Sequence, residues 1–97
     1  MKVVFNYPLN IIGDSLNIVV PVDTEVLGIK MVDTLYGSKE PELLVLTDPG
    51  EENTELLRIY HILPLQSFDA DDLQYLFADE RGSYWVANKR YPLAIGA

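Results

Sequence analysis

The chain has 97 residues, 48% of them hydrophobic, with no cysteine, one histidine and a formal net charge of −8. This length predicts a single domain over residues 1–97, and the apolar content is too high for a disordered protein. A structural zinc site within one chain is excluded because zinc takes about four Cys, His or carboxylate ligands. The acidic balance argues against binding to duplex nucleic acid, which requires a basic surface.

Apolar and polar residues alternate over short segments that are separated by turn residues, which is the pattern of β-strands. Pro8 is typical of an edge strand or of the end of a strand. Strand 42–47 is apolar on both faces and is predicted to be central, as is 54–63, which holds the longest apolar run. The predicted strands are residues 2–9, 15–22, 26–33, 42–47, 54–63, 73–79 and 83–90. We therefore expect an all-β fold, a small antiparallel β-sandwich or partly open barrel of about seven short strands.

Turn residues between the strands give more local predictions. Asp48-Pro49-Gly50 predicts a type II turn, with Gly50 where φ must be positive. Gly82 is predicted to take the left-handed position in the hairpin loop after strand 73–79. Ser67 or Asp69 is predicted to cap a short helical turn over Asp71 and Asp72, the only helical turn expected.

Other features of the sequence concern the surroundings of the protein. No apolar run approaches the roughly 20 residues that a membrane helix needs. The N-terminus has the pattern of a strand, without the small-residue cleavage site of a signal peptide. The absence of cysteine favours a reducing compartment. We expect a cytoplasmic protein without a membrane partner, in which residues 91–97 form a flexible tail.

Aromatic and basic residues lie close together on two predicted strands. Arg58 and Tyr60 share one face of strand 54–63, and Trp85 and Lys89 share one face of the last strand, with Arg90 on the opposite face. Aromatic rings beside basic groups fit a nucleobase stacked next to its phosphate. The same residues also fit core aromatics with basic neighbours whose charged ends reach water, and the spacing leaves both interpretations open.

His61 lies among apolar neighbours, a setting more typical of a half-buried structural histidine than of a catalytic one. The sequence carries no nucleophile elbow, phosphate-binding loop or histidine pair. We therefore predict that the protein is not an enzyme and has no catalytic residue, cofactor or metal site. Free strand edges and a terminal hairpin rich in Tyr and Trp predict a homo-oligomer.

Seven short segments together resemble a family of small phage-encoded proteins related to anti-CBASS sponge proteins. These segments are Phe5–Leu9, Val20-Pro21, Glu25–Ile29, Leu44–Pro49, Leu57–Tyr60, Leu73–Leu76 and Tyr84–Val86. Family members often carry Gly-Thr-Gly-His-Pro after the Arg-x-Ile strand, where this chain has His61-Ile62-Leu63-Pro64.

The resemblance implies a phage immune-evasion protein that acts in the host cytoplasm. Such a sponge binds a cyclic dinucleotide defence signal, such as 3′3′-cGAMP, without cleaving it, and is usually an oligomer. If this chain acts in the same way, the candidate residues are Tyr7, Tyr60 or Trp85 to stack the bases, Arg58, Lys89 or Arg90 to meet phosphate, and His61 to donate or accept a hydrogen bond.

Two acidic clusters support an alternative. They lie in segments 48–55 and 69–80, and their simplest interpretation is solvated loops that aid solubility. The alternative function is a phage protein–protein interaction module or an acidic inhibitor that docks on a basic host protein through these segments.

Overall fold

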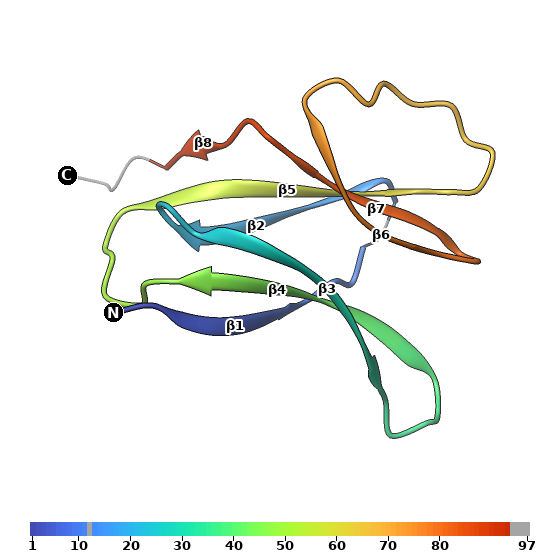
Figure 1. Ribbon diagram of the computed structural model, residues 1–97, viewed down its shortest axis with the longest axis horizontal. Coiled ribbons are helices and arrows are strands. Elements are labelled where there is room, and N and C mark those ends of the chain that lie inside the picture. Colours follow the sequence, from blue (N-terminus) through green and yellow to red (C-terminus); the bar gives the residue numbers. More distant parts are fainter. Residues whose placement is uncertain (12, 94–97) are drawn as a thin grey trace.

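The computed structural model describes residues 1–11 and 13–93, and this part of the chain forms eight strands and no helix (Figure 1). Every strand pairing is antiparallel. The strands are β1 (Val3–Pro8), β2 (Ser15–Pro21), β3 (Glu25–Asp33), β4 (Lys39–Thr47), β5 (Thr54–Ile62), β6 (Leu73–Asp79), β7 (Gly82–Ala87) and β8 (Tyr91–Pro92). The prediction of a small antiparallel all-β fold is confirmed.

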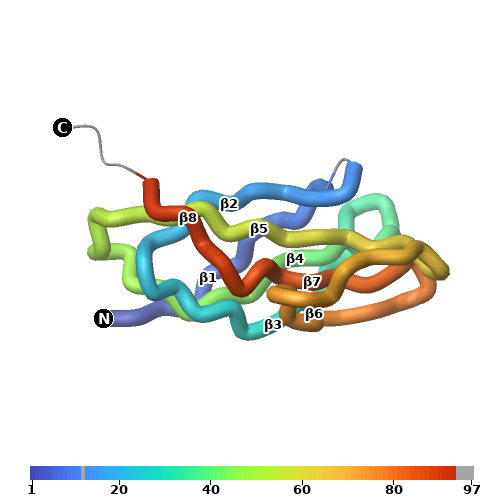
Figure 2. The backbone as a smooth tube through the Cα atoms, turned by 90° about the horizontal axis from the view of Figure 1, so that it is seen from above, coloured from blue at the N-terminus to red at the C-terminus, as the bar shows by residue number. Residues whose placement is uncertain are grey.

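The strands form two sheets that pack face to face (Figure 2). The first sheet has the order β1-β4-β3, and the second has the order β2-β5-β7-β6. The short β8 pairs with the start of β5. It lies on the same side of β5 as β7, which pairs with the second half of that strand. Strands β4 and β5 are therefore central and β1 is an edge strand, as the sequence predicted.

The core lies between the two sheets and is built by alternate residues of the central strands. Leu43 and Val45 of β4 face Leu57 and Ile59 of β5, and all four are fully buried. Alternation arises because successive side chains of a strand point to opposite faces of the sheet. Burying each such side chain contributes about 1.5–3 kcal/mol. The other buried members of this core are Leu9, Ile18, Val20, Tyr84 and Val86.

The turn after β4 differs from the prediction. Gly50 has no positive φ, so the turn at Asp48-Pro49-Gly50 is not type II. The Asp48 carboxylate accepts a hydrogen bond from the Gly50 N–H at 2.9 Å, and the Asp48 carbonyl accepts one from Glu51 at 3.1 Å. The Asp side chain thus stabilises a turn that needs no left-handed residue. Gly82, in contrast, has a φ of 138°, which confirms its predicted left-handed conformation.

The segment before β6 forms no helix. Asp69 does cap a turn, because its carboxylate accepts a hydrogen bond from the Asp71 N–H at 2.9 Å. The Leu73 N–H then donates to the Ala70 carbonyl at 3.1 Å, so one tight turn leads directly into β6. At the C-terminal end, Tyr91 and Pro92 form β8, and the Leu93 N–H donates to the Thr54 carbonyl at 3.0 Å. Residues 94–97 of the predicted tail lie outside the described residues. No helix able to cross a membrane occurs in residues 1–11 and 13–93.

Candidate functional site

The outer face of the second sheet, which points away from the core, brings together four of the seven predicted ligand-binding residues. Tyr60 of β5 lies directly opposite Trp85 of β7, and Arg58 is two residues before Tyr60 on the same face. Lys89 follows β7, and its Nζ lies 5.4 Å from the centroid of the Tyr91 ring. Because Tyr91 pairs with Leu56, which has the same parity as Arg58 and Tyr60, Tyr91 belongs to this face as well.

Arg58 is exposed and held by two neighbours. It lies opposite Asn17 of β2, and its Nε donates to the Asn17 side-chain oxygen at 2.8 Å. Its Nη1 lies 3.5 Å from the Tyr60 hydroxyl oxygen, and this hydrogen bond raises the pKa of the Arg58 guanidinium above its ordinary value. The guanidinium is thus fixed beside an aromatic ring with N–H groups left to meet an anion.

A cavity of about 400 Å³ opens on this face, under the segment that connects β5 to β6. We call it the outer-face cavity. Its volume falls within the range of about 300–1,000 Å³ that is typical of small-molecule sites. Its walls combine aromatic and aliphatic side chains with three carboxylates and one ammonium group. They are formed by Tyr60, Ile62, Phe68, Asp69, Asp71, Asp72, Leu73, Ala87, Lys89 and Tyr91.

Trp85 lies on this face and contacts the segment that connects β5 to β6. Phe68 meets the Trp85 ring edge-on with centroids 5.1 Å apart, and Tyr75 meets it edge-on at 5.4 Å. The indole N–H donates to the Ser83 hydroxyl at 2.8 Å. These contacts anchor Phe68, so Trp85 positions one wall of the outer-face cavity, while Tyr60, Phe68 and Tyr91 line it directly.

The charges around the cavity are mixed. Asp69, Asp71 and Asp72 lie on one wall, and Lys89 lies on another next to Tyr91. Carboxylates accept hydrogen bonds from N–H groups, and ammonium and guanidinium groups donate to anions. The face therefore suits a ligand that combines a flat ring bearing N–H donors with a negatively charged group.

The other three predicted residues lie elsewhere. Tyr7 points to the inner face of the first sheet, where its ring contacts Phe5 with centroids 4.8 Å apart. His61 has the opposite parity to Tyr60 and lies on the inner side of the second sheet. Arg90 also points between the sheets. These three residues do not join the outer-face cavity.

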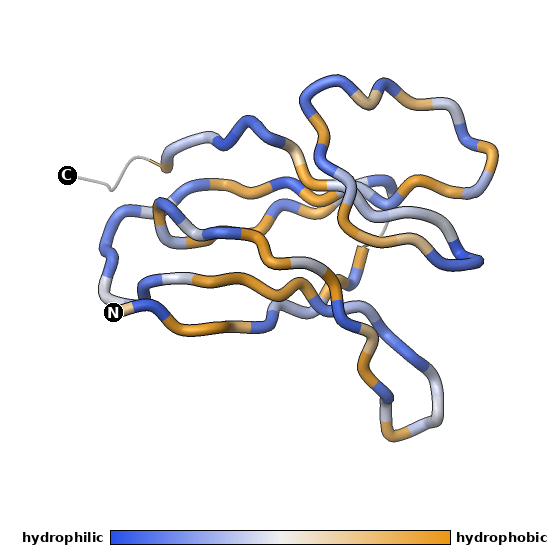
Figure 3. The backbone as a smooth tube through the Cα atoms, viewed as in Figure 1, coloured by the Kyte–Doolittle hydropathy of each residue, from blue (hydrophilic) through white to orange (hydrophobic). Residues whose placement is uncertain are grey.

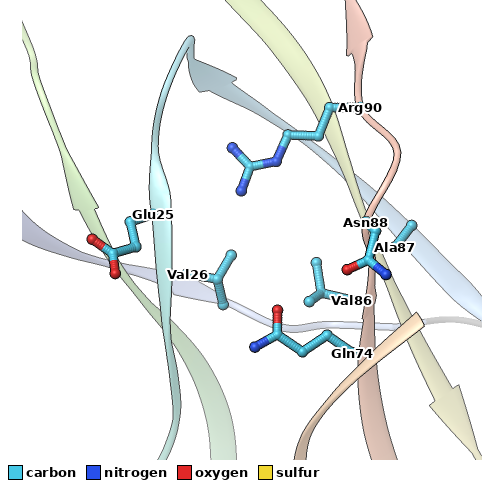
Figure 4. A pocket seen from close by; sticks show the side chains of 7 residues that line it. All are labelled: Glu25, Val26, Gln74, Val86, Ala87, Asn88 and Arg90. Atoms are coloured by element: carbon cyan, nitrogen blue, oxygen red, sulfur yellow. The ribbon is translucent and has the colours of Figure 1, made fainter. Parts of the chain in front are cut away.

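Arg90 links the two sheets at the end of the sandwich where β8 begins. Its Nη1 donates to the Glu55 carboxylate at 2.8 Å and to the Thr24 carbonyl. Figure 4 shows the guanidinium reaching from the β7–β8 connection toward β3, above a polar pocket of about 230 Å³. The charge of Arg90 is thus already matched by Glu55.

His61 stacks on Tyr84, with ring centroids 4.6 Å apart and an angle of 12° between the ring planes. Its Nε2 is buried and has no hydrogen-bond partner within the described part of the chain. Gly82 packs against the same ring. The structural role that the sequence favours for His61 stays a prediction.

Tyr84 provides a pH-dependent prediction. Burial raises the pKa of its phenol; Asp79 adds to this effect and Arg81 opposes it. An unfolded tyrosine ionises near pH 10, so above this pH the unfolded state releases its proton first and stability falls as pH rises. We expect the free energy of unfolding of Tyr84→Phe to fall less steeply than that of the wild type between about pH 9 and 11.

The measurement is urea denaturation at several alkaline pH values. One proton per molecule corresponds to a slope of at most about 1.4 kcal/mol per pH unit. Tyr36→Phe is the matched control because the Tyr36 side chain is 95% exposed. An equal change of slope in both variants would contradict the assignment to Tyr84.

The sequence reasoning missed several residues of the outer-face cavity. Phe68 belongs to an irregular segment and Tyr91 to the expected tail, so neither had a periodic pattern to place it on this face. The carboxylates of Asp69, Asp71 and Asp72 were recognised only as an acidic turn. The available signal was the aromatic Phe68 directly before an acidic run, which is an unusual residue for a purely solvated loop.

Comparisons with other proteins add no family. No family model matches the sequence, and searches of curated proteins and of solved structures find no match. Within residues 1–11 and 13–93, no group of three or more His, Cys, Asp or Glu side chains is arranged to hold a metal ion.

Proposed function

We propose that this protein binds a cyclic dinucleotide on the outer face of the second sheet and sequesters it without cleaving it. In this proposal it is a phage immune-evasion protein that acts in the cytoplasm of the host cell. The observation that carries the proposal is the outer-face cavity, in which Tyr60, Phe68 and Tyr91 surround a space next to Lys89, with Arg58 fixed beside Tyr60.

The parts of a cyclic dinucleotide match the groups on this face. A base enters the cavity and stacks on the Tyr60 or Tyr91 ring, an interaction worth about 1–3 kcal/mol per base. The carboxylates of Asp69 and Asp72 accept hydrogen bonds from N–H groups on the base edge. The bridging phosphates meet Lys89 and Arg58, where charge-assisted hydrogen bonds form.

The net charge of −8 sets a condition on this binding. A cyclic dinucleotide is anionic, so the field of the whole protein opposes its approach. The binding free energy must then come from short-range contacts at Arg58, Lys89 and the aromatic rings. This explains why a flat ligand with few phosphates fits this face better than a long nucleic acid, whose affinity depends on many phosphate contacts.

Replacement of Arg58 tests the proposal directly. We expect Arg58→Ala to weaken cyclic-dinucleotide binding about 10–100-fold, since a hydrogen bond to a charged group contributes about 1.5–3 kcal/mol. Folding is expected to be retained because Arg58 is exposed. Calorimetric titration with a panel of cyclic di- and trinucleotides that includes 3′3′-cGAMP measures the affinity.

Arg81→Ala is the matched control. Arg81 is also an exposed arginine, but it pairs with Asp79 at 3.3 Å in the β6–β7 hairpin, away from the outer-face cavity. Its loss should leave the affinity unchanged. Native mass spectrometry should recover the bound nucleotide with its original mass, as sequestration without cleavage requires.

Full affinity in a folded Arg58→Ala protein would contradict the site. Failure of the wild type to bind any member of the panel would contradict the function itself. Charge reversal in the acidic segments 48–55 and 69–80, followed by capture of a basic host protein, would then test the alternative function.

A further inference from the structure

Strand β1 is a free sheet edge with little protection against pairing. The other edge of the first sheet, β3, has a bulge between Val26 and Gly28, and the edge strand β6 has one between Tyr75 and Phe77. Bulges of this kind hinder pairing with another strand. Strand β1 pairs with β4 over its whole length without a bulge.

The first half of β1 carries exposed apolar side chains, and the exposed Asn6 follows them. Val3, Val4 and Phe5 are 40%, 60% and 50% exposed, and they follow one another in the sequence. Figure 3 shows this hydrophobic stretch near the N-terminus, on the strand that borders the molecule in this view. On β2, the remaining edge strand, Val19 is the exposed large apolar residue within the described range. Consecutive exposed apolar residues on a free edge favour contact with another strand.

The pairing register shows which backbone groups of β1 are free. The Leu9 N–H donates to the Pro41 carbonyl of β4 at 3.1 Å. Backbone groups alternate in direction along an antiparallel strand, so Phe5 and Tyr7 also bond to β4. The N–H and C=O groups of Val4 and Asn6 therefore point away from β4, toward the free edge.

We propose that a second copy of this chain pairs with β1 through its own β1, in antiparallel orientation about a two-fold axis at Phe5. In this register Val4 of each copy exchanges both backbone hydrogen bonds with Asn6 of the other. The two Phe5 side chains lie opposite each other and cover the exposed half of each ring. The first sheets of both copies then form one continuous sheet of six strands.

Charge complementarity selects this register. Glu42 pairs with Pro8 across β1–β4, and its carboxylate accepts a hydrogen bond from the Asn6 amide at 3.2 Å. With the axis at Phe5, Lys2 of the second copy lies opposite Pro8, two strands from Glu42 and about 10 Å away between Cα atoms. Two long side chains span this distance, so each Lys2 meets a Glu42. No acidic residue lies within Val3–Pro8, so the edges approach each other with little of the repulsion expected from the net charge of −8.

Proline substitutions test the interface without removing bonds inside one chain. Val4→Pro removes an N–H that points to the free edge, and is expected to convert the dimer into a monomer in light-scattering chromatography. Val19→Pro is the matched control. The Val22 N–H donates to the carbonyl of Asn53, just before β5, and the Asp14 carbonyl accepts from His61 of β5. Because backbone groups alternate in direction, the Val19 N–H points away from β5, toward the free edge of β2. This variant should stay a dimer.

Single cysteines test the register, because the natural chain has none. Phe5→Cys is expected to form an intermolecular disulfide. The two Phe5 residues would form a non-hydrogen-bonded antiparallel pair, in which the Cα atoms are about 4.5 Å apart. Val4→Cys should not form one, because each Val4 lies opposite Asn6 of the other copy. The two Val4 Cα atoms are then farther apart than the roughly 7 Å that a disulfide can bridge. A monomeric wild type, loss of the dimer in Val19→Pro alone, or crosslinking through Val4→Cys would each overturn the proposal.

Discussion

Replacing Gly82 with alanine is expected to lower the free energy of unfolding by about 3 kcal/mol or more. Gly82 has a φ of 138°, which residues with a side chain rarely adopt. An alanine Cβ would also overlap the Ile62 carbonyl oxygen and lie 2.9 Å from the His61 Nε2. Both are contacts with β5, the central strand of the second sheet, so relief of the overlap requires separation of β7 from β5.

The control for this prediction separates backbone strain from overlap. Gly37 also has a positive φ, of 78°, but nothing lies within 4 Å of its Cβ position. Gly37→Ala should therefore lower stability only by the strain, about 1 kcal/mol. Urea denaturation followed by circular dichroism gives both values. Equal losses in the two variants would show that the contact with Ile62 and His61 is unimportant.

The strands and the core were predictable because they depend on local periodicity. Leu57 and Ile59 alternate with Arg58 and Tyr60, and this two-residue period separates a buried from an exposed face wherever a strand stays regular. The central position of β4 followed from its apolar character on both faces, and that of β5 followed from the longest apolar run in the chain. For the same reason the sequence placed Arg58 and Tyr60 on one face correctly.

Other features depend on the geometry of the irregular segments and could not be read from periodicity. The bulge between Tyr75 and Phe77 shifts the register of β6, so strict alternation fails along this strand. The type of the turn at Asp48 depends on a side-chain hydrogen bond. The Asp48 carboxylate accepts from the Gly50 N–H, and Gly50 does not adopt a positive φ. Phe68 lines the outer-face cavity and contacts Trp85 of a distant strand, a contact that periodicity does not predict.

Arg90 is a candidate ligand-binding residue whose charge is paired within the fold. Arg90 has the same predicted role as Arg58 and Lys89, because a basic residue near aromatic ones has no local feature that reveals its partner. In the fold, its side chain is only 25% exposed and contacts Glu55, which is 13% exposed. Glu55 and Arg90 are 35 residues apart in the sequence. They meet because the chain returns to β5 and pairs with it as β8.

We expect Arg90→Met to lower the free energy of unfolding by about 1.5–3 kcal/mol, because it leaves the Glu55 carboxylate and the Thr24 carbonyl without their donor. Removing the Glu55 charge as well, in Arg90→Met with Glu55→Gln, should recover part of this loss. Denaturation of the two single variants and the double variant gives the coupling energy between the residues.

The same variants distinguish a structural from a ligand-binding Arg90. If the ligand binds on the outer face, folded Arg90→Met should keep full affinity for a cyclic dinucleotide while Arg58→Ala loses it. Loss of affinity in Arg90→Met with unchanged stability would instead place the ligand between the sheets. Because Arg90 and Arg58 lie on opposite faces of the second sheet, this pair of measurements assigns the ligand to one face.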